Sequence, residues 1–146
     1  MNIRPYRSSD TPLLMNIFQQ NIPKYFDPSE IKDFEEYLAE QPDTYLTIED
    51  NGQIIGGVGY YVKEEDRSGR ITWIFFHPDQ SRKGHGRTVV EYCLEKLMAD
   101  DRVQKLVVTT SQHAYLFFEK FGYQVLQTEK DHWGPGLDLY LMERDK

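Results

Sequence analysis

The sequence predicts an α/β fold, in which a mixed β-sheet carries helices on its faces. The chain has 146 residues, the usual size of one domain. Segments with apolar residues every three to four positions alternate along it with short runs of β-branched and aromatic residues. Hydrophobic residues make up 39% and aromatic residues 14% of the chain, which supports a packed core and argues against disorder.

The N-terminal part of the chain predicts one strand followed by two helices. Residues 2–7 alternate weakly between apolar and polar, as in a short strand. A helix follows with Thr11 as its N-cap and Pro12 at its first position, and it ends at 21–23. The second helix opens at 27–29, after which apolar residues recur with helical spacing.

The middle of the chain predicts three strands. The first two, 44–48 and 53–62, flank a hairpin turn of sequence Asp-Asn-Gly at 50–52. Three glycines in the second strand predict a bulge or the close approach of another backbone. Residues 71–76 are almost all apolar β-formers, so we expect a central strand that is buried on both faces.

Two helices and three strands complete the predicted order. A long helix covers 84–99, and a buried strand follows at 106–109. Ser111 then caps a short helix, and the last two strands lie at 123–128 and 137–142.

The composition excludes several classes of protein. The single cysteine, Cys93, rules out a disulfide framework, and its place on the apolar stripe of the long helix predicts a buried, unreactive thiol. A net charge of −7 disfavours nucleic acid as a partner. No apolar run approaches the roughly 18 residues of a membrane span, and the N-terminus lacks the apolar core of a signal peptide. We therefore expect a cytoplasmic protein, monomeric or homodimeric, with no membrane partner and no metal.

Acidic residues gather in one stretch, with nine between Asp27 and Asp50 against Lys32 alone. Most of those in the second helix fall on the face opposite its apolar residues, as on an ordinary solvated surface. The alternative is a negative field that attracts a cationic partner.

The clearest local signal is the loop 81–87, Ser-Arg-Lys-Gly-His-Gly-Arg, which joins the central strand to the long helix. Glycines at a helix start expose backbone N–H groups, and the helix dipole adds partial positive charge. Arg82, Lys83 and Arg87 add three cations. The loop therefore predicts a site for phosphate or pyrophosphate, with a tight turn that binds nothing as the alternative. It has neither the P-loop spacing nor the third glycine of a dinucleotide-binding turn.

Two parts of the chain, taken together, resemble a known family. One combines Phe-Phe-His-Pro-Asp at 75–79 with Gly-His-Gly at 84–86, and the other is Ala-Tyr-Leu-Phe-Phe-Glu-Lys-Phe-Gly-Tyr at 114–123. In order and spacing they resemble the acetyl-CoA signature and the Ala-x-x-Phe-Tyr-Glu-Lys-x-Gly-Phe motif of the GNAT superfamily of N-acetyltransferases. The resemblance implies one domain over 1–146, with a mixed, mostly antiparallel central sheet that contains a splayed strand pair and is flanked by helices.

The resemblance also implies acetyl-CoA as the cosubstrate. Its pyrophosphate would lie on 82–87, and its pantetheine arm would add to the central strand near Ile74 and Phe76. The acyl group would lie where that strand splays from 106–109, with a backbone N–H near Phe76 to stabilise the oxyanion. The implied cofactor-binding residues are Ile74, Phe75, Phe76, Ser81, Arg82, Lys83, Gly84, His85, Gly86, Arg87, Ser111, Phe117, Phe118 and Lys120.

The chain departs from the family pattern at catalytically important positions. Ser81 replaces a Gln or Arg, for which Gln80 or Arg82 could compensate. Ser111 replaces an Asn, and its hydroxyl could still hydrogen-bond the pantetheine. Phe118 replaces the Tyr that protonates the departing thiolate, and phenylalanine cannot donate a proton. The alternative donors are Tyr115, one turn earlier on the same helix, Tyr140 on the last strand, water, or the ammonium intermediate.

No general base stands out in the sequence. The candidates lie at strand ends, turns or helix edges, where a surface or capping role is the alternative for each: Glu49, Asp50, His77, His113 and His132. The turn 131–136, which contains Trp133, either lines the acceptor site or packs the last hairpin, and Tyr60 and Tyr61 leave the same alternatives open.

These features favour an N-acetyltransferase that moves acetyl from acetyl-CoA to a primary amine, by direct attack. The amine would belong to a small cationic molecule or to a peptide or protein. A non-catalytic acyl-CoA-binding module and a nucleotide- or phosphate-binding domain are the alternatives.

Overall fold

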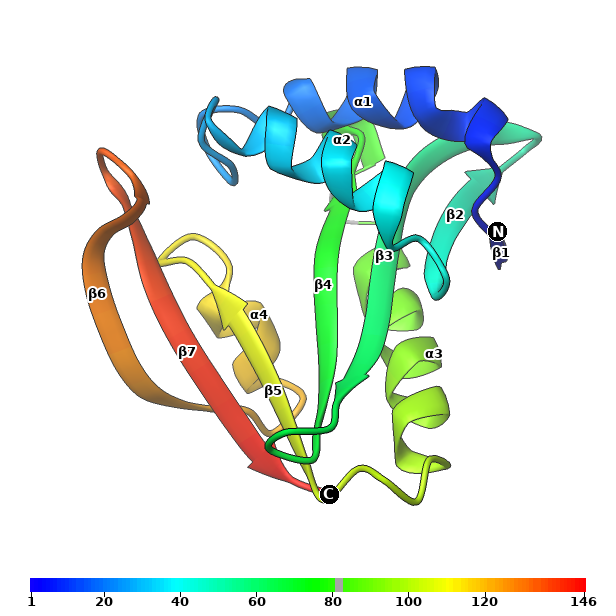
Figure 1. Ribbon diagram of the computed structural model, residues 1–146. Helices are drawn as coiled ribbons and strands as arrows, with labels where there is room; N and C mark the ends of the chain where they lie inside the picture. Colours follow the sequence, from blue (N-terminus) through cyan, green and yellow to red (C-terminus); the bar gives the residue numbers. More distant parts are fainter. Residues whose placement is uncertain (81–82) are drawn as a thin grey trace.

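A seven-stranded sheet in the order β1-β2-β3-β4-β5-β7-β6 runs through the computed structural model, which describes residues 1–80 and 83–146 (Figure 1). Neighbouring strands are antiparallel except β4 and β5, which run parallel. The elements are β1 (Asn2–Pro5), α1 (Thr11–Gln19), α2 (Glu30–Glu40), β2 (Tyr45–Asp50), β3 (Gln53–Lys63), β4 (Ser68–Phe76), α3 (His85–Met98), β5 (Lys105–Thr110), α4 (Tyr115–Glu119), β6 (Gln124–Gly134) and β7 (Leu137–Asp145). The predicted order and the mixed, mostly antiparallel sheet are confirmed.

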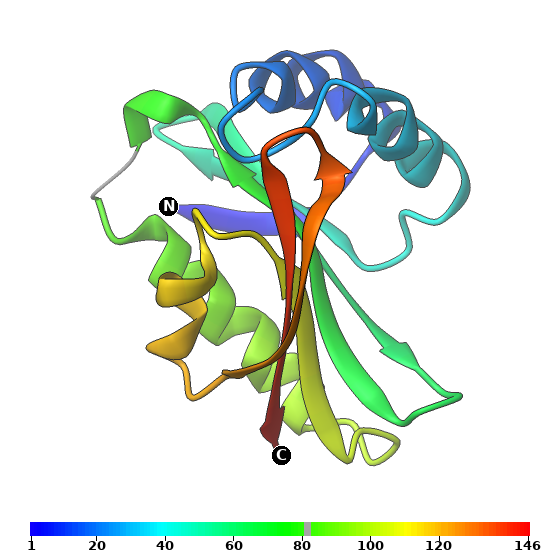
Figure 2. The ribbon, with the colours of Figure 1, turned by 90° about the vertical axis from the view of Figure 1, so that its left-hand side faces the viewer.

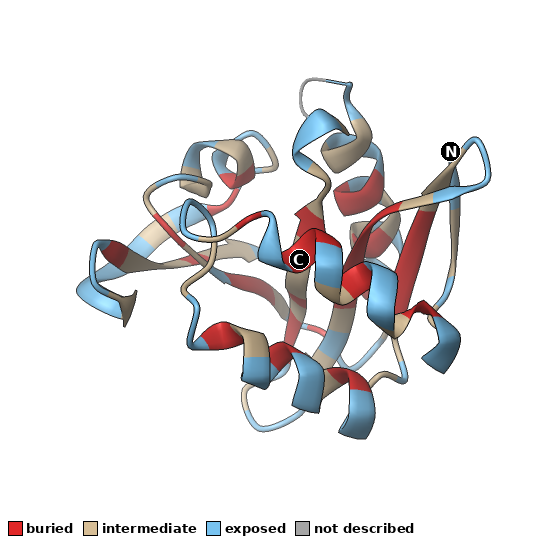
Figure 3. Ribbon diagram, turned by 90° about the horizontal axis from the view of Figure 1, so that it is seen from above, coloured by how far each residue is buried: buried red, intermediate tan, exposed pale blue. Residues whose placement is uncertain are grey.

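The helices cover both faces of the sheet. Figure 2 shows α1 and α2 on one side of the strands and α3 and α4 on the other. Viewed from above, buried and exposed residues alternate along the helices, as expected when one side of each helix packs on the sheet (Figure 3).

The layer between α1, α2 and the sheet is largely aromatic. The Phe18 and Phe34 rings stack 4.8 Å apart, and the Phe34 ring lies 5.2 Å from that of Trp73 and 5.3 Å from that of Phe75 on β4. This packing fixes α2 over the C-terminal half of β4.

The layer beneath α3 and α4 is aliphatic in its larger part. Cys93 is fully buried there beside Val89, Val90 and Leu97, and burial raises the pKa of its thiol to about 12. The prediction of a buried, structural cysteine is confirmed. Met98, the last residue of α3, is 40% exposed.

The parallel strands β4 and β5 pair only at their N-terminal ends. Three register pairs join 68–70 to 105–107, and beyond these the two strands diverge (Figure 1). The expected splay is therefore present. The expectation that β4 is buried on both faces is wrong: Ile71 and Phe75 are buried, whereas the residues between them and Phe76 are half-buried, because β4 loses a neighbour there.

A bulge interrupts the pairing of β3 with β4, as the glycines predicted. The register shifts between Gly57 and Gly59, and Trp73 on the opposite strand has a left-handed backbone with φ of 48°. A Cβ at Gly56 would lie 3.0 Å from the Cα of Phe76, so two backbones approach closely at this point.

The last hairpin is longer than predicted. Residues 131–134 belong to β6, and the turn is confined to Pro135 and Gly136. Hydrogen bonds across the strands hold this polar segment: the Asp131 N–H donates to Asp138 Oδ1 at 2.9 Å, and the Gly136 N–H donates to Asp131 Oδ1 at 2.7 Å.

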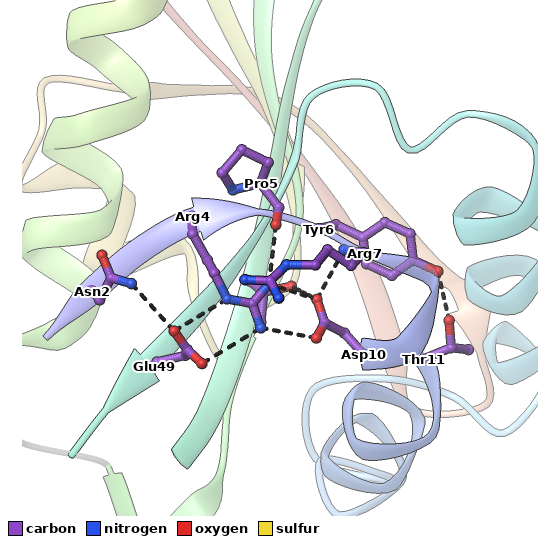
Figure 4. A network of polar contacts seen from close by, with 9 residues as sticks. Asn2, Arg4, Pro5, Tyr6, Arg7, Asp10, Thr11 and Glu49 are labelled. Atoms are coloured by element: carbon purple, nitrogen blue, oxygen red, sulfur yellow. Dashed lines mark hydrogen bonds and ion pairs between the residues drawn. The ribbon is translucent and has the colours of Figure 1, made fainter. Parts of the chain in front are cut away.

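A buried ion pair ties β1 to the start of α1 (Figure 4). The Arg4 guanidinium donates two hydrogen bonds of 2.9 Å to Asp10, and its Nε lies 3.1 Å from Glu49 Oε1 on β2. Asp10, and not Thr11, directly precedes the first residue of α1. Within the described ranges, no helix is long and apolar enough to cross a membrane.

Candidate acetyl-CoA and acceptor site

The splay leaves one edge of β4 without a partner strand. The space between the diverging parts of β4 and β5 is called the gap below. The His77 N–H donates to the Ile55 carbonyl on β3 at 2.7 Å, so alternation along the strand turns the peptide groups of Ile74 and Phe76 toward this gap. The buried Asn21 amide donates to the Phe76 carbonyl at 2.9 Å and to the Ile17 carbonyl at 2.9 Å. This leaves the Phe76 N–H facing the gap, where an added extended chain or an oxyanion could accept from it.

The bulge above this edge is held by a buried tyrosine. Tyr45 is 1% exposed, and its hydroxyl donates to the Trp73 carbonyl at 2.9 Å. The Tyr45 ring lies where a side chain at Gly57 would be, since a Cβ there would be 2.7 Å from its Cε2. The absence of a side chain at Gly57 therefore leaves space for the Tyr45 ring, whose hydroxyl holds the carbonyl of Trp73.

The glycine-rich loop lies at the N-terminus of the 14-residue helix α3. Gly84 precedes its first residue with φ of 78°, and no atom lies within 4 Å of where its Cβ would be. A Cβ at Gly86 would lie 3.3 Å from the Phe117 ring and 3.8 Å from the Phe76 ring. The loop therefore meets β4 and α4 at Gly86 and is open at Gly84.

The basic residues of the loop are in different situations. Lys83 is exposed, whereas the exposed Arg87 pairs with Glu91 one turn along α3, at 3.0 Å. Ser81 and Arg82 lie outside the described residues. An exposed ion pair of this kind is weak, so Arg87 can exchange Glu91 for another anionic partner.

The structure brings together the two tyrosines that could replace the missing acid. The Tyr115 and Tyr140 rings stack 4.6 Å apart, and both residues are half-buried. Tyr140 is the register partner of Thr110, the last residue of β5, so the pair lies where β5 ends beside the gap. Phe118 is 4% exposed and packs against Phe117 and Tyr123 in the core.

Some of the other predicted cofactor-binding residues are half-buried beside the gap, and the rest are buried elsewhere or exposed. Ile74, Phe76, His85 and Phe117 are half-buried, and the His85 and Phe76 rings lie 6.4 Å apart. Ser111 is buried and caps the turn into α4: its Oγ accepts from the His113 N–H at 3.2 Å. Phe75 faces the α1–α2 layer, and Lys120 is exposed beyond the end of α4.

Two segments far apart in the chain meet at the front of the gap. The tip of the β6–β7 hairpin lies beside the α1–α2 loop (Figure 2), where the Asp27 side chain fills the space next to Gly134. Trp133 Nε1–H donates to the Thr110 carbonyl at 3.1 Å, and the Phe26 ring stacks on Trp73 at 6.2 Å. The α1–α2 loop and the hairpin therefore frame the side from which an acceptor would reach the splay.

Each predicted general-base candidate either has a hydrogen-bond or ion-pair partner elsewhere or is exposed to solvent. Glu49 belongs to the Arg4 network, where the hydrogen bond from Arg4 lowers its pKa, and Asp50 lies 3.5 Å from the N-terminal amine. His77 accepts from the Asp79 N–H at 3.1 Å, His113 is exposed, and His132 lies 2.9 Å from Glu129. Tyr60 packs against the core and Tyr61 is 41% exposed. Among the described residues, no group of three or more His, Cys, Asp or Glu side chains could hold a metal ion.

A carboxyl that the sequence analysis did not single out lies at the front of the gap. Glu30, the first residue of α2, is 7% exposed, and its Oε2 accepts from the Asp27 N–H at 2.9 Å. Burial raises its pKa to about 7, against the lowering effect of that hydrogen bond, and the charges of Asp27 and Asp33 add to the rise. Its four-residue spacing from Phe34, on the apolar face of α2, was the signal in the sequence.

The family model for acetyltransferases of the GNAT family matches residues 11–123, and the chain belongs to this family. The most similar curated proteins fall short of a significant match. Among solved structures, the ribosomal-protein-alanine N-acetyltransferase from Brucella melitensis superposes with a TM-score of 0.77 at 19% identity, covering 100% of both chains.

Two further structures contain coenzyme A. The spermidine N-acetyltransferase from Vibrio cholerae, in complex with CoA and spermine, has a TM-score of 0.76 at 18% identity and covers 99% of this chain and 94% of its own. An aminoglycoside 6'-N-acetyltransferase with coenzyme A has a TM-score of 0.75 at 15% identity, covering 99% and 97%. These likenesses show the fold, and acetyl-CoA is the cosubstrate of the family.

Proposed function

We propose that this protein is an N-acetyltransferase that moves the acetyl group of acetyl-CoA to a primary amine. The observation that carries the proposal is the splay of β4 from β5, which frees the edge of β4 beyond Arg70. An open strand edge inside a sheet is a binding surface for an extended chain, because unpaired N–H and C=O groups must find partners.

The residues around this edge fit the parts of acetyl-CoA. Gly84 offers open space at the N-terminus of α3, where backbone N–H groups and the helix dipole favour a pyrophosphate. Lys83 and, on exchange of its Glu91 partner, Arg87 add positive charge. The peptide groups of Ile74 and the Phe76 N–H would bond an amide-containing arm, whereas the Phe76 carbonyl already accepts from Asn21.

Acetyl-CoA supplies an activated thioester, and the attacking amine must be neutral. As its nitrogen bonds the carbonyl carbon, the Phe76 N–H would donate to the thioester oxygen, where negative charge develops. As the C–S bond breaks, the hydroxyl of Tyr115 or Tyr140 would protonate the sulfur, since Phe118 has no proton to give, and the proton lost by the amine nitrogen would return to that tyrosine or pass to water. No acyl-enzyme is needed, because the one cysteine is buried away from the gap.

The acceptor that we propose is a cation. Asp27 packs against Gly134 in the β6–β7 hairpin, Asp27 and Asp33 are near enough to Glu30 to raise its pKa, and the segment that contains these acids is strongly acidic. Apparent affinity for the acceptor should then fall as salt rises, because such attraction is screened over about 8–10 Å at physiological ionic strength. A best substrate with net negative charge would contradict this part of the proposal.

Release of free CoA thiol in the presence of a panel of primary amines tests the function. Thiol release together with a mass-identified acetylated amine would support it. The burial of Phe118 favours a second candidate, a non-catalytic acyl-CoA-binding module, which would bind acetyl-CoA and release no thiol with any amine. Tight binding of ATP in preference to acetyl-CoA would contradict both.

A further inference from the structure

The buried carboxyl of Glu30 lies on the side of α2 that faces the bulge of β4. Glu30 and Phe34 are four residues apart and 7% and 0% exposed, so they share the inner face of the helix. The Phe34 ring is 5.2 Å from that of Trp73, the left-handed residue of the bulge. Glu30 is therefore one helical turn, about 6 Å along the axis, beyond that contact and toward the hairpin.

The far side of Glu30 is closed by the β6–β7 hairpin. Asp27, whose N–H bonds Glu30, packs against Gly134, and His132 lies close enough for its positive form to lower the pKa of Glu30. Trp133 anchors this hairpin to the end of β5. Glu30 thus lies between the bulge of β4 and the tip of the β6–β7 hairpin, which is anchored to β5.

The charge of Glu30 is poorly compensated. Within 1–80 and 83–146, no Lys, Arg or His forms an ion pair with it, and Asp27 N–H is its one hydrogen-bond donor. Its nearest charged neighbours include two acids, Asp27 and Asp33, and His132 is itself paired with Glu129. A buried carboxylate with one donor and two negative neighbours is costly to keep charged.

We propose that Glu30 is the specificity-determining carboxylate of the acceptor site, where it binds an ammonium group of the amine substrate. A cation placed there would supply the missing partner of the buried carboxylate and would lie on the side from which an acceptor would reach the splay. The inference deepens the proposed function and rests on it for the identity of the ligand as an acceptor.

The acid–base state of Glu30 makes this binding measurable without turnover. With a pKa of about 7, Glu30 is mostly protonated at pH 6, and an ammonium group favours the charged form. Binding of a cation at pH 6 must therefore release protons, and affinity should rise between pH 6 and pH 8. A variant at Glu30 is needed to assign the released protons to this residue.

The experiment is calorimetric titration of the CoA-loaded protein with 1,4-diaminobutane at pH 6, in two buffers that differ in ionisation enthalpy. Wild type should release protons on binding. Glu30→Gln, which keeps an oxygen for the Asp27 N–H, should lose most of this release and bind the diamine about 10–100-fold more weakly, the usual effect of a hydrogen bond to a charged group. Glu36→Gln, an exposed residue of the same helix, is the matched control and should change affinity less than two-fold.

Two results would overturn the inference: no diamine binding by wild type, or equal affinity and proton release in wild type and Glu30→Gln. If Glu30→Gln does not fold, the comparison is made in wild type alone. There, an affinity that does not rise between pH 6 and pH 8 counts against the inference. Failure of the proposed function is a separate result, because absence of thiol release with every amine leaves the binding titration readable.

Discussion

The left-handed bulge of β4 depends on one buried hydroxyl, which Tyr45→Phe would remove. The Tyr45 hydroxyl donates to the Trp73 carbonyl at 2.9 Å, and Tyr45 is 1% exposed. Phenylalanine fills the same space but leaves this carbonyl without its donor. Because Trp73 has φ of 48°, the unpaired carbonyl belongs to a residue whose backbone is already strained.

An unsatisfied buried carbonyl costs about 1–3 kcal/mol, and for a chain of this length that lowers the melting temperature by about 3–12 °C. Urea unfolding and a thermal melt measure the stability, and calorimetric titration with CoA measures the site. We expect the variant to be less stable, because the Trp73 carbonyl has lost its donor. We also expect weaker CoA binding, because relaxation of the bulge would turn the peptide groups of Ile74 and Phe76 away from the gap.

Gly57→Ala, on β3, perturbs the same hydrogen bond between the Tyr45 hydroxyl and the Trp73 carbonyl. A Cβ at this position would lie 2.7 and 2.8 Å from two carbons of the Tyr45 ring, so the ring must move. The matched control is Gly52→Ala, at a hairpin turn with open space around it, where positive φ adds strain but touches no part of the site. If Tyr45→Phe unfolds at the wild-type temperature and binds CoA with wild-type affinity, the reasoning about the bulge is refuted.

Three further predictions follow from other parts of the molecule. Burial would raise the pKa of Asp10, but hydrogen bonds led by that from Arg4 lower it to about 2, so Asp10→Asn should cost about 2 kcal/mol at pH 7. Because the folded pKa is lowered, this contribution is present above about pH 4, the unfolded value, and is lost as pH falls toward 2; urea unfolding should show the wild type and the variant converging there. Cys93 should carry no acetyl group after incubation with acetyl-CoA alone, and a stoichiometric adduct in the mass spectrum would contradict its structural role. Tyr115→Phe or Tyr140→Phe should lower turnover about 10²–10⁴-fold with unchanged acetyl-CoA binding, whichever donates the proton. Because the rings stack, the double variant should lose less than the two single losses combined, and wild-type turnover in both single variants would show that the thiolate needs no side-chain acid.

The sequence was sufficient to predict the order of elements, because apolar spacing reflects which residues face the core. It predicted the end of the last hairpin poorly. Residues 131–134, Asp-His-Trp-Gly, lack strand periodicity, and they are held to β7 by side-chain bonds such as that from the Asp131 N–H to Asp138 Oδ1. Such bonds depend on register, which periodicity alone does not specify.

The sequence carries more information on the candidate cofactor side of the site than on the candidate acceptor side. Glycines at a helix start and the residues of β4 form contiguous motifs, whereas the surroundings of Glu30 depend on His132 and Gly134, about 100 positions away in the chain. An acid in the first turn of a helix is ordinarily explained by the helix dipole, so its burial could not be inferred locally. The stacking of Tyr115 on Tyr140 likewise follows from the pairing of Thr110 with Tyr140.

Amide chemical shifts of the labelled protein during titration with CoA test the central claim most directly. If CoA lies along the free edge of β4 with its pyrophosphate on the loop, the largest changes should fall at 74–76 and 84–87. A folded Gly84→Trp variant should lose the changes at 84–87, because the side chain would occupy the open space there. Changes confined to other parts of the sheet, or unaltered in Gly84→Trp, would contradict the account.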